Sequence, residues 1–267
     1  MPQIKVACWN INSVRLRINQ AVDFIQTHNP DILCLQETKV VDDQFPEKPF
    51  RNLGYEALAI HGQKAYNGVA ILSRIPFENV DKRSFCGKAD ARHVAVTLQG
   101  GIELHNFYVP AGGDEPDPAI NEKFAHKLAF LDEMESWFAG WHGPDRPLRL
   151  LVGDLNIAPL ENDVWSHKQL LKVVSHTPVE VERLNRVQSA FQWVDIARQF
   201  IPPSEKHFTW WSYRARDWRA SNRGRRLDHI WASPELAQRA RGFAVAETMR
   251  DLPQPSDHAP IVASFDI

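Results

Sequence analysis

The chain has 267 residues, of which 43% are hydrophobic and 24% charged, and its formal net charge is −2. This composition is that of a globular protein and excludes disordered and fibrous chains. No apolar run approaches the ~18 residues of a membrane span, and the N-terminus lacks a charged head followed by an apolar stretch. We therefore expect a cytoplasmic protein with no membrane partner. The balanced charge excludes a histone-like positive coat but allows a local nucleic-acid-binding patch.

The three cysteines are Cys8, Cys34 and Cys86. Their number is odd, their spacing is not that of a metal site, and Cys8 and Cys34 lie within apolar runs. Free thiols in a reducing compartment are the simplest interpretation.

Short apolar runs rich in β-branched residues, most of them bounded by Gly, Pro, Asn or Asp, predict the strands. They cover residues 3–9, 31–36, 55–60, 68–73, 93–98, 103–109, 149–154, 227–232 and 260–265. Helical spacing predicts helices over 18–28, 124–138 and roughly 186–200. Strands that occur both in succession and alternating with helices indicate a layered α/β domain with mixed sheets. No stretch resembles a linker, so we expect one domain over residues 1–267.

The strand predicted over 149–154 runs into Asp154-Leu155-Asn156. Residues i and i+2 of a strand face the same way, so both polar side chains are expected to project from its end. A carboxylate beside a carboxamide can hold a water by two hydrogen bonds and take its proton. A structural Asx turn fits this segment equally well.

Asn10 and Asn12 repeat this spacing at the end of the first predicted strand. They can donate to a phosphate or position a metal-bound water, although a structural role is favoured for this pair alone. Glu37 ends the second, otherwise apolar run. A carboxylate there needs an ion-pair partner or a cation, and its hard oxygens suit Mg²⁺ or Mn²⁺. Both alternatives fit the sequence.

Asp257 and His258 immediately precede the last predicted strand. The imidazole can donate to a phosphate oxygen if another carboxylate fixes its tautomer and keeps it charged. Asp228, an acid within an apolar strand, is the candidate for that carboxylate. Four strand ends with such polar groups are hard to explain as turns alone.

Residues 214–226 contain six arginines and one acid, Asp217. Trp210 and Trp211 precede this run, and Trp218 lies within it. Guanidinium groups bind phosphates, and indole rings stack on bases or fill the hole left by a missing base. A solvated loop is the alternative, but exposed paired tryptophans would need a reason.

With these residues assembled, the chain resembles the exonuclease III family of abasic-site endonucleases, part of the endonuclease/exonuclease/phosphatase superfamily. The matching motifs span nearly the whole chain. They are Trp9-Asn10-Ile11-Asn12, Leu35-Gln36-Glu37-Thr38-Lys39, Asn67-Gly68-Val69-Ala70-Ile71-Leu72-Ser73, Tyr108-Val109-Pro110, Gly153-Asp154-Leu155-Asn156-Ile157-Ala158-Pro159, Arg226-Leu227-Asp228 and Ser256-Asp257-His258-Ala259-Pro260, together with Phe208-Thr209-Trp210-Trp211.

The resemblance implies a four-layer α/β sandwich of two packed mixed β-sheets flanked by helices. It also implies roles for the residues above. Glu37 would hold the divalent metal with Asn10 and Asp257 nearby, Asp154 and Asn156 would orient the attacking water, His258 with Asp228 would bind the scissile phosphate, and Tyr108 would contact the phosphate or the leaving oxygen. DNA would contact Asn12, Trp210, Trp211, Arg216, Arg219, Arg223, Arg225 and Leu227.

Two departures from the family pattern stand out. After Tyr108-Val109-Pro110 the family usually offers an amide side chain to the phosphate, whereas this chain has Ala111, with a backbone N–H or Asp114 as the substitutes. Arg225 occupies a position beside the abasic-sugar pocket that is commonly apolar or aromatic.

The resemblance implies a monomeric Mg²⁺-dependent DNA phosphodiesterase of base excision repair, with Mn²⁺ as a second candidate metal. It would cleave 5′ to abasic sites in double-stranded DNA and act at 3′ ends as a phosphodiesterase and 3′–5′ exonuclease. The alternative is a phosphodiesterase of the same fold that acts on RNA, a phosphoinositide or sphingomyelin. A catalytically dead binding module would require loss of an acid or the histidine, and each of these groups is present.

Overall fold

The computed structural model describes residues 3–141, 147–215 and 217–267. Its strands, in chain order, are β1 (Gln3–Asn10), β2 (Ile32–Gln36), β3 (Ala57–His61), β4 (Val69–Ser73), β5 (Phe77–Asp81), β6 (His93–Leu98), β7 (Glu103–Tyr108), β8 (Arg149–Asp154), β9 (Val194–Asp195), β10 (Trp210–Trp211), β11 (Gly224–Arg225), β12 (Asp228–Ala232), β13 (Ala240–Val245) and β14 (Ile261–Asp266). Twelve of them form two six-stranded mixed sheets, ordered β13-β14-β1-β2-β4-β3 and β5-β6-β7-β8-β12-β9. β10 and β11 form a separate ribbon.

The helices are α1 (Ile18–His28), α2 (Glu47–Arg51), α3 (Glu122–Ala139), α4 (His167–Leu170), α5 (Pro178–Phe191), α6 (Ile196–Phe200), α7 (Trp218–Ser221) and α8 (Pro234–Ala237). Short 3₁₀ turns cover Asp42–Gln44, Glu161–Asp163 and Glu247–Asp251. Among the described residues, no helix is both long and apolar enough to cross a membrane.

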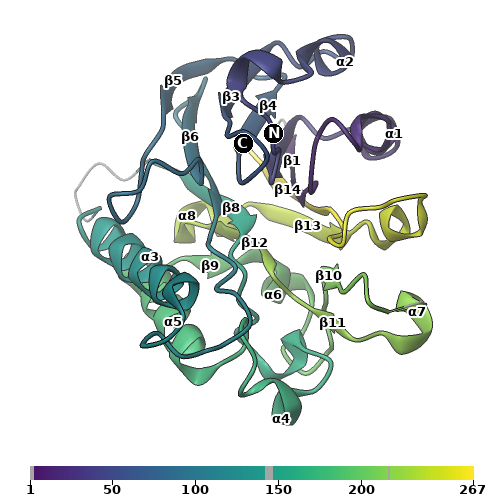
Figure 1. Cartoon of the computed structure of the whole chain (residues 1–267). Coiled ribbons are helices and arrows are strands. Elements are labelled where there is room, and N and C mark those ends of the chain that lie inside the picture. The colour runs from purple at the N-terminus through teal and green to yellow at the C-terminus, as the bar shows by residue number, and fades with distance from the viewer. Residues whose placement is uncertain (1–2, 142–146, 216) are drawn as a thin grey trace.

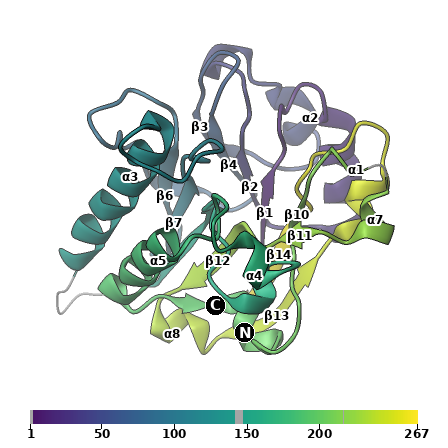
Figure 2. The same cartoon turned by 60° about the horizontal axis from the view of Figure 1, so that its bottom comes forward.

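The helices cover the outer faces of the two packed sheets. α1 and α2 lie on the first sheet (Figure 1), and Figure 2 shows α3 and α5 side by side over the second. Strand periodicity builds these layers, because Val6 and Cys8 point into the core between the sheets while Ala7 and Trp9 pack toward α1. The predicted four-layer α/β sandwich is confirmed.

The helix predicted over residues 186–200 is wrong in its bounds. α5 ends at Phe191 because Gln192 adopts the left-handed conformation with φ 61°, and β9 separates it from α6. The true start carried a signal at Thr177-Pro178-Val179-Glu180. There Glu180 Oε2 accepts the Thr177 backbone N–H at 3.1 Å, which forms a capping box with proline in the first turn.

Five strands were not predicted: the two-residue strands β9, β10 and β11, and the longer strands β5 and β13. The reason for missing the longer two is their position. β5 and β13 both lie at sheet edges. Buried and exposed residues do not alternate along them, and most of their residues are exposed or half-buried. An edge strand that buries so little apolar surface leaves no apolar run in the sequence.

Candidate active site

The predicted catalytic residues come from both sheets and meet at one rim of the sandwich. β1 and β2 run parallel with Asn10 opposite Gln36, which places Asn10 beside Glu37. β8 and β12 run antiparallel with Asp154 directly opposite Asp228. Packing of the two sheets then brings the Asn10 Nδ2 to 2.9 Å from Asp154 Oδ2.

His258 lies between two buried carboxylates. Its Nδ1 is 2.9 Å from Asp228 Oδ2, and its Nε2 is 3.7 Å from Asp154 Oδ2. Thr209 Oγ1 donates to the same Asp228 oxygen at 2.6 Å. Burial disfavours the charged ring, but Asp228 and then Asp154 outweigh it and raise the pKa of His258 to about 10. The ring is therefore an imidazolium at neutral pH and a strong donor to an oxyanion.

Asp154 is 1% exposed and accepts three hydrogen bonds. The side-chain nitrogens of Asn10 and Asn156 donate to Oδ2 at 2.9 and 3.2 Å, and the Asn156 backbone N–H donates to Oδ1 at 2.9 Å. Burial raises the pKa of Asp154 to about 7, against the opposing charge of His258 and with added repulsion from Asp228. A carboxyl group with this pKa can take and return a proton near neutral pH.

Asn156 reaches Asp154 through a turn, and not along a strand. β8 ends at Asp154, and Asn156 has a left-handed backbone with φ 55°. The prediction that both side chains project from one strand face is therefore wrong, and the alternative Asx turn forms. That turn still sets the Asn156 carboxamide against the Asp154 carboxylate, so the expected pair of side chains forms through a turn and not along a strand.

Glu37 is held by two donors. Asn10 Nδ2 lies 2.8 Å from Glu37 Oε1, and Lys39 Nζ lies 2.8 Å from Glu37 Oε2. Burial opposes the charged form, but Lys39 and then Asn10 outweigh it and lower the pKa of Glu37. The ion-pair alternative is thus realised through Lys39, a residue that sequence reasoning missed although it lies two positions from the acid.

Oxygen atoms of Glu37, Asn10 and Asp257 make up the set that would hold a divalent cation. Asp257 is fixed at both oxygens, by Asn12 Nδ2 at 3.1 Å and by Trp210 Nε1 at 2.9 Å. Burial opposes ionisation of Asp257, but the charge of His258 outweighs it and lowers the pKa of this carboxyl. Two ionised carboxylates with a carboxamide fit a hard cation such as Mg²⁺ or Mn²⁺.

A second cluster, Asp154, Asp228 and His258, has potential ligand atoms within 4.8 Å of one another. A metal ligand must be a neutral imidazole, whereas the two acids hold His258 protonated. The Glu37 side of the rim is therefore the better cation site.

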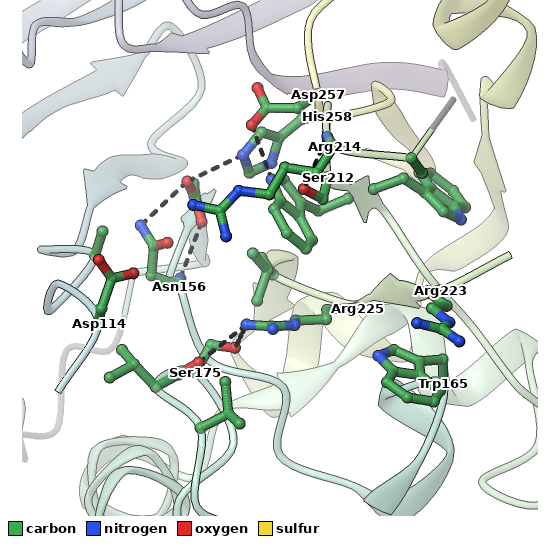
Figure 3. A pocket seen from close by; sticks show the side chains of 18 of the residues that line it. Asp114, Asn156, Trp165, Ser175, Ser212, Arg214, Arg223, Arg225, Asp257 and His258 are labelled. Carbon is green, nitrogen blue, oxygen red and sulfur yellow. Dashed lines mark hydrogen bonds and ion pairs between the residues drawn. The ribbon is translucent and has the colours of Figure 1, made fainter. Parts of the chain in front are cut away.

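The rim opens into a cavity of about 790 Å³ (Figure 3). Its lining includes the predicted catalytic groups together with Trp210, Leu227, Val174, Ser175 and Arg225. Tyr108 lines the cavity and is 8% exposed. Burial and the nearby Glu37 and Asp154 raise the pKa of Tyr108, so its hydroxyl remains a donor.

The predicted DNA-contacting residues divide into three sets. Trp210, Arg223, Arg225 and Leu227 line the cavity, with the Arg223 guanidinium over the Trp165 ring at 4.8 Å. Asn12 lies beside it on Asp257. Arg219 forms an exposed ion pair with Asp251, with Nη2 2.5 Å from Oδ2. Arg216 lies outside the described residues.

Trp211 does not present the exposed ring that stacking on a base requires. Trp211 is 2% exposed, packs on Phe208 and Trp218, and donates its Nε1 to Asn222 Oδ1 at 3.1 Å. Although it reaches the cavity wall, it has almost no free ring face on which a base could stack.

Three further cavity residues were missed or left unassigned by sequence reasoning: Ser175, Ser212 and Arg214. Arg214 belongs to the basic run and could have been named from it, whereas the two serines carry no signal in the sequence. Ala111 and Asp114 also line the cavity, so the position after Tyr108-Val109-Pro110 offers no side-chain amide.

The model of the Endonuclease/Exonuclease/phosphatase family matches residues 7–258, a span that includes every rim residue described above. The chain belongs to this family.

Three relatives, one compared by sequence and two by structure, match this chain over their own full length. Exodeoxyribonuclease III of Haemophilus influenzae is 32% identical over 98% of this chain and 100% of its own. An AP endonuclease structure from Archaeoglobus fulgidus has a TM-score of 0.90 and 32% identity, covering 99% of this chain and 100% of that one. A Neisseria 3′ phosphatase structure bound to product DNA hairpin has a TM-score of 0.88 and 30% identity, with the same coverage of both chains.

Proposed function

We propose that this family member hydrolyses phosphodiesters of double-stranded DNA, cutting 5′ to abasic sites and removing blocking groups or nucleotides from 3′ ends in base excision repair. The observation that carries the proposal is the buried Asp154 carboxylate, poised near neutral pH beside the charged His258 on the wall of a cavity large enough for a nucleotide. The names of its relatives, exodeoxyribonuclease III and AP endonuclease, support the same substrate.

In this mechanism His258 donates from Nε2 to a non-bridging oxygen of the scissile phosphate, and Asp228 keeps the ring charged and fixed. Asp154 accepts a proton from the attacking water, which Asn156 helps to orient. The neutral Tyr108 hydroxyl donates to the phosphate or to the leaving oxygen. A divalent cation, Mg²⁺ in our proposal or else Mn²⁺, would be held by Glu37, Asn10 and Asp257 and would supply positive charge against the phosphate.

For the substrate we propose that Trp210 and Leu227 flank an extrahelical sugar in the cavity. Asn12, Trp211, Arg216, Arg219, Arg223 and Arg225 remain proposed DNA contacts, with Trp211 acting by supporting the wall because its ring is buried. We further propose that residues 1–267 form one catalytic domain that works as a monomer in the cytoplasm, in keeping with the buried free thiols Cys8 and Cys34.

The test uses an end-labelled duplex with one stable abasic-site analogue and an undamaged duplex with recessed 3′ ends, each with Mg²⁺ and with EDTA. We expect a Mg²⁺-dependent cut immediately 5′ to the lesion, which Glu37→Gln and Asp154→Asn both abolish in folded protein. A 3′ ladder without that cut would make the protein mainly an exonuclease. Cleavage of RNA, a phosphoinositide or sphingomyelin, with none of either duplex, would replace DNA as the substrate.

A further inference from the structure

Arg225 lines the cavity away from Asp257 and His258 (Figure 3), and its guanidinium is not neutralised by an ion pair with any residue that the structure describes. Its Nη1 donates to the Val174 carbonyl at 3.0 Å and to Ser175 Oγ at 2.8 Å (Figure 3). Its Nε is buried and has no hydrogen-bond partner among the described residues. No acid in the described part of the chain forms an ion pair with it. Arg225 is half-buried and stays charged, and among the described residues the one acid that acts on it, Glu180, is already paired with Lys127. A ligand that supplies an anion in the cavity would therefore be favoured there.

The neighbouring Arg226 is a buried guanidinium with a structural role, and it pairs with acids. Arg226 forms paired bonds to Asp163, both at 2.8 Å, and a third to Asp195 at 2.6 Å. Adjacent positions in one segment therefore differ sharply: one guanidinium is fully neutralised and faces the core, while the other faces the cavity unneutralised.

Arg225 is also held in place before any ligand arrives. Ser175, which accepts its hydrogen bond, has a left-handed backbone with φ 88°, and its N–H donates to Glu180 at 3.0 Å. Glu180 in turn forms a fully buried ion pair with Lys127 at 2.5 Å. An arginine fixed in this way loses little side-chain entropy when it binds a ligand. Its guanidinium is therefore better suited to recognise one particular group than a mobile surface arginine would be.

The position of Arg225 relative to the catalytic groups follows from Trp210. The indole Nε1 binds Asp257, next to His258, and the Arg225 guanidinium carbon lies 5.1 Å from the indole ring centroid. One indole therefore lies between the rim and the unmatched cation. A group recognised by Arg225 would belong to the part of the substrate just beyond the scissile phosphate, and not to that phosphate itself.

We propose that Arg225 is a specificity-determining residue that binds a carboxylate on the phosphoryl fragment being removed, as in a 3′-phosphoglycolate end, and so favours such ends over ends that lack the carboxylate. The inference rests on the proposed function and names a substrate class for the same site. In the reaction, water adds to phosphorus and the bond from phosphorus to the 3′ oxygen breaks. One water proton passes by way of Asp154 to that oxygen, giving a 3′-hydroxyl and free phosphoglycolate. The carboxylate is unchanged, so Arg225 acts by binding alone.

The test compares two duplexes with recessed 3′ ends that differ in one terminal group. One ends in 3′-phosphoglycolate, and the other in the 3′-phosphohydroxyethyl ester, which has an uncharged hydroxyl in place of the carboxylate. We expect wild-type kcat/KM to favour the glycolate roughly tenfold or more, the effect of one charge-assisted hydrogen bond. Arg225→Leu should bring the ratio to about one, and Arg225→Lys should retain part of the preference. A ratio measured within one enzyme cancels any general change in DNA affinity, and melting temperatures confirm that each variant is folded.

The matched control is Arg186→Leu on α5, away from the cavity lining, which removes a positive charge that pairs with Asp132 and Glu135 of α3. It should keep the wild-type ratio. An equal rate on both ends in wild type, or a ratio that survives Arg225→Leu, overturns the inference. If Arg225→Leu instead slows only internal abasic-site cleavage, the cation contacts the next backbone phosphate and the inference is also wrong. Failure of the wild-type protein to remove either end counts against the proposed function itself.

Discussion

Two groups of buried charges in this chain are built alike and behave in opposite ways. In the first, here called the Asp163 network, Asp163 and Asp195 meet Arg226 and Arg198. Burial disfavours the Asp163 carboxylate, but the guanidinium groups outweigh it and lower the pKa of Asp163 to about 2. Each charge has a partner of opposite sign, so the network is inert in the neutral pH range.

The second group, here called the His258 cluster, sets the acids Asp154 and Asp228 against the single cation His258. Here one cation faces two acids. The charge of His258 therefore does not offset burial and the repulsion from Asp228, and the pKa of Asp154 is raised to about 7. The comparison teaches that charge balance, and not burial itself, separates a structural network from a reactive one.

The largest expected effect is loss of cleavage in Asp154→Asn, because a carboxamide cannot accept the proton of the attacking water. The cleavage rate should fall by ~10²–10⁴, measured in single turnover on the abasic duplex. Asp23→Asn, which neutralises an exposed acid of α1, serves as the control and should cleave like wild type. Comparable rates in the two variants would remove Asp154 from the mechanism.

In the Asp163 network we expect a loss of stability and not of chemistry. Asp163→Asn leaves Arg226 buried with one acidic partner fewer, and should lower the free energy of unfolding by about 3–5 kcal/mol, measured by urea denaturation. Asp251→Asn breaks the exposed pair with Arg219 and should cost at most about 1 kcal/mol. Similar losses in both variants would show that the network contributes no more than a surface ion pair.

The two groups should also respond to pH with opposite signs. The lowered pKa of Asp163 contributes stability above the unfolded value of about 3.9, and this is lost as pH falls toward about 2, a change of about 2–3 kcal/mol that Asp163→Asn should lack. The raised pKa of Asp154 costs stability as pH rises from about 4 through about 7. In EDTA, Asp154→Asn should therefore gain stability relative to wild type between pH 5 and pH 8. Parallel pH curves for the three proteins would contradict both assignments.

The smallest expected effect concerns the basic run. If Arg219 leaves Asp251 to contact one phosphate, Arg219→Ala should reduce the slope of log affinity against log salt by about 0.9, measured by DNA binding at several salt concentrations. The free energy of unfolding should change little because the residue is exposed. An unchanged slope would place the DNA on another surface.

The sequence by itself determined the layers and the chemistry at the strand ends. Alternating apolar residues such as Val6 and Cys8 report which faces are buried, and an acid such as Asp228 within an apolar strand is expensive enough to require a partner. His258, Asp154 and Glu37 could therefore be named as candidate site residues without coordinates, while their proposed roles came from the family resemblance.

Only the tertiary structure decided which polar groups meet and which are left alone. The contact of Asn10 with Asp154 crosses two sheets, and the burial of Trp211 depends on Phe208 and Trp218. Among the described residues Arg225 forms no ion pair, because the nearby Glu180 pairs with Lys127, while Arg226 beside it pairs with two acids. Local patterns encode burial and turns, but the partner of a side chain is set by the packing of segments far apart in the chain, which no local pattern contains.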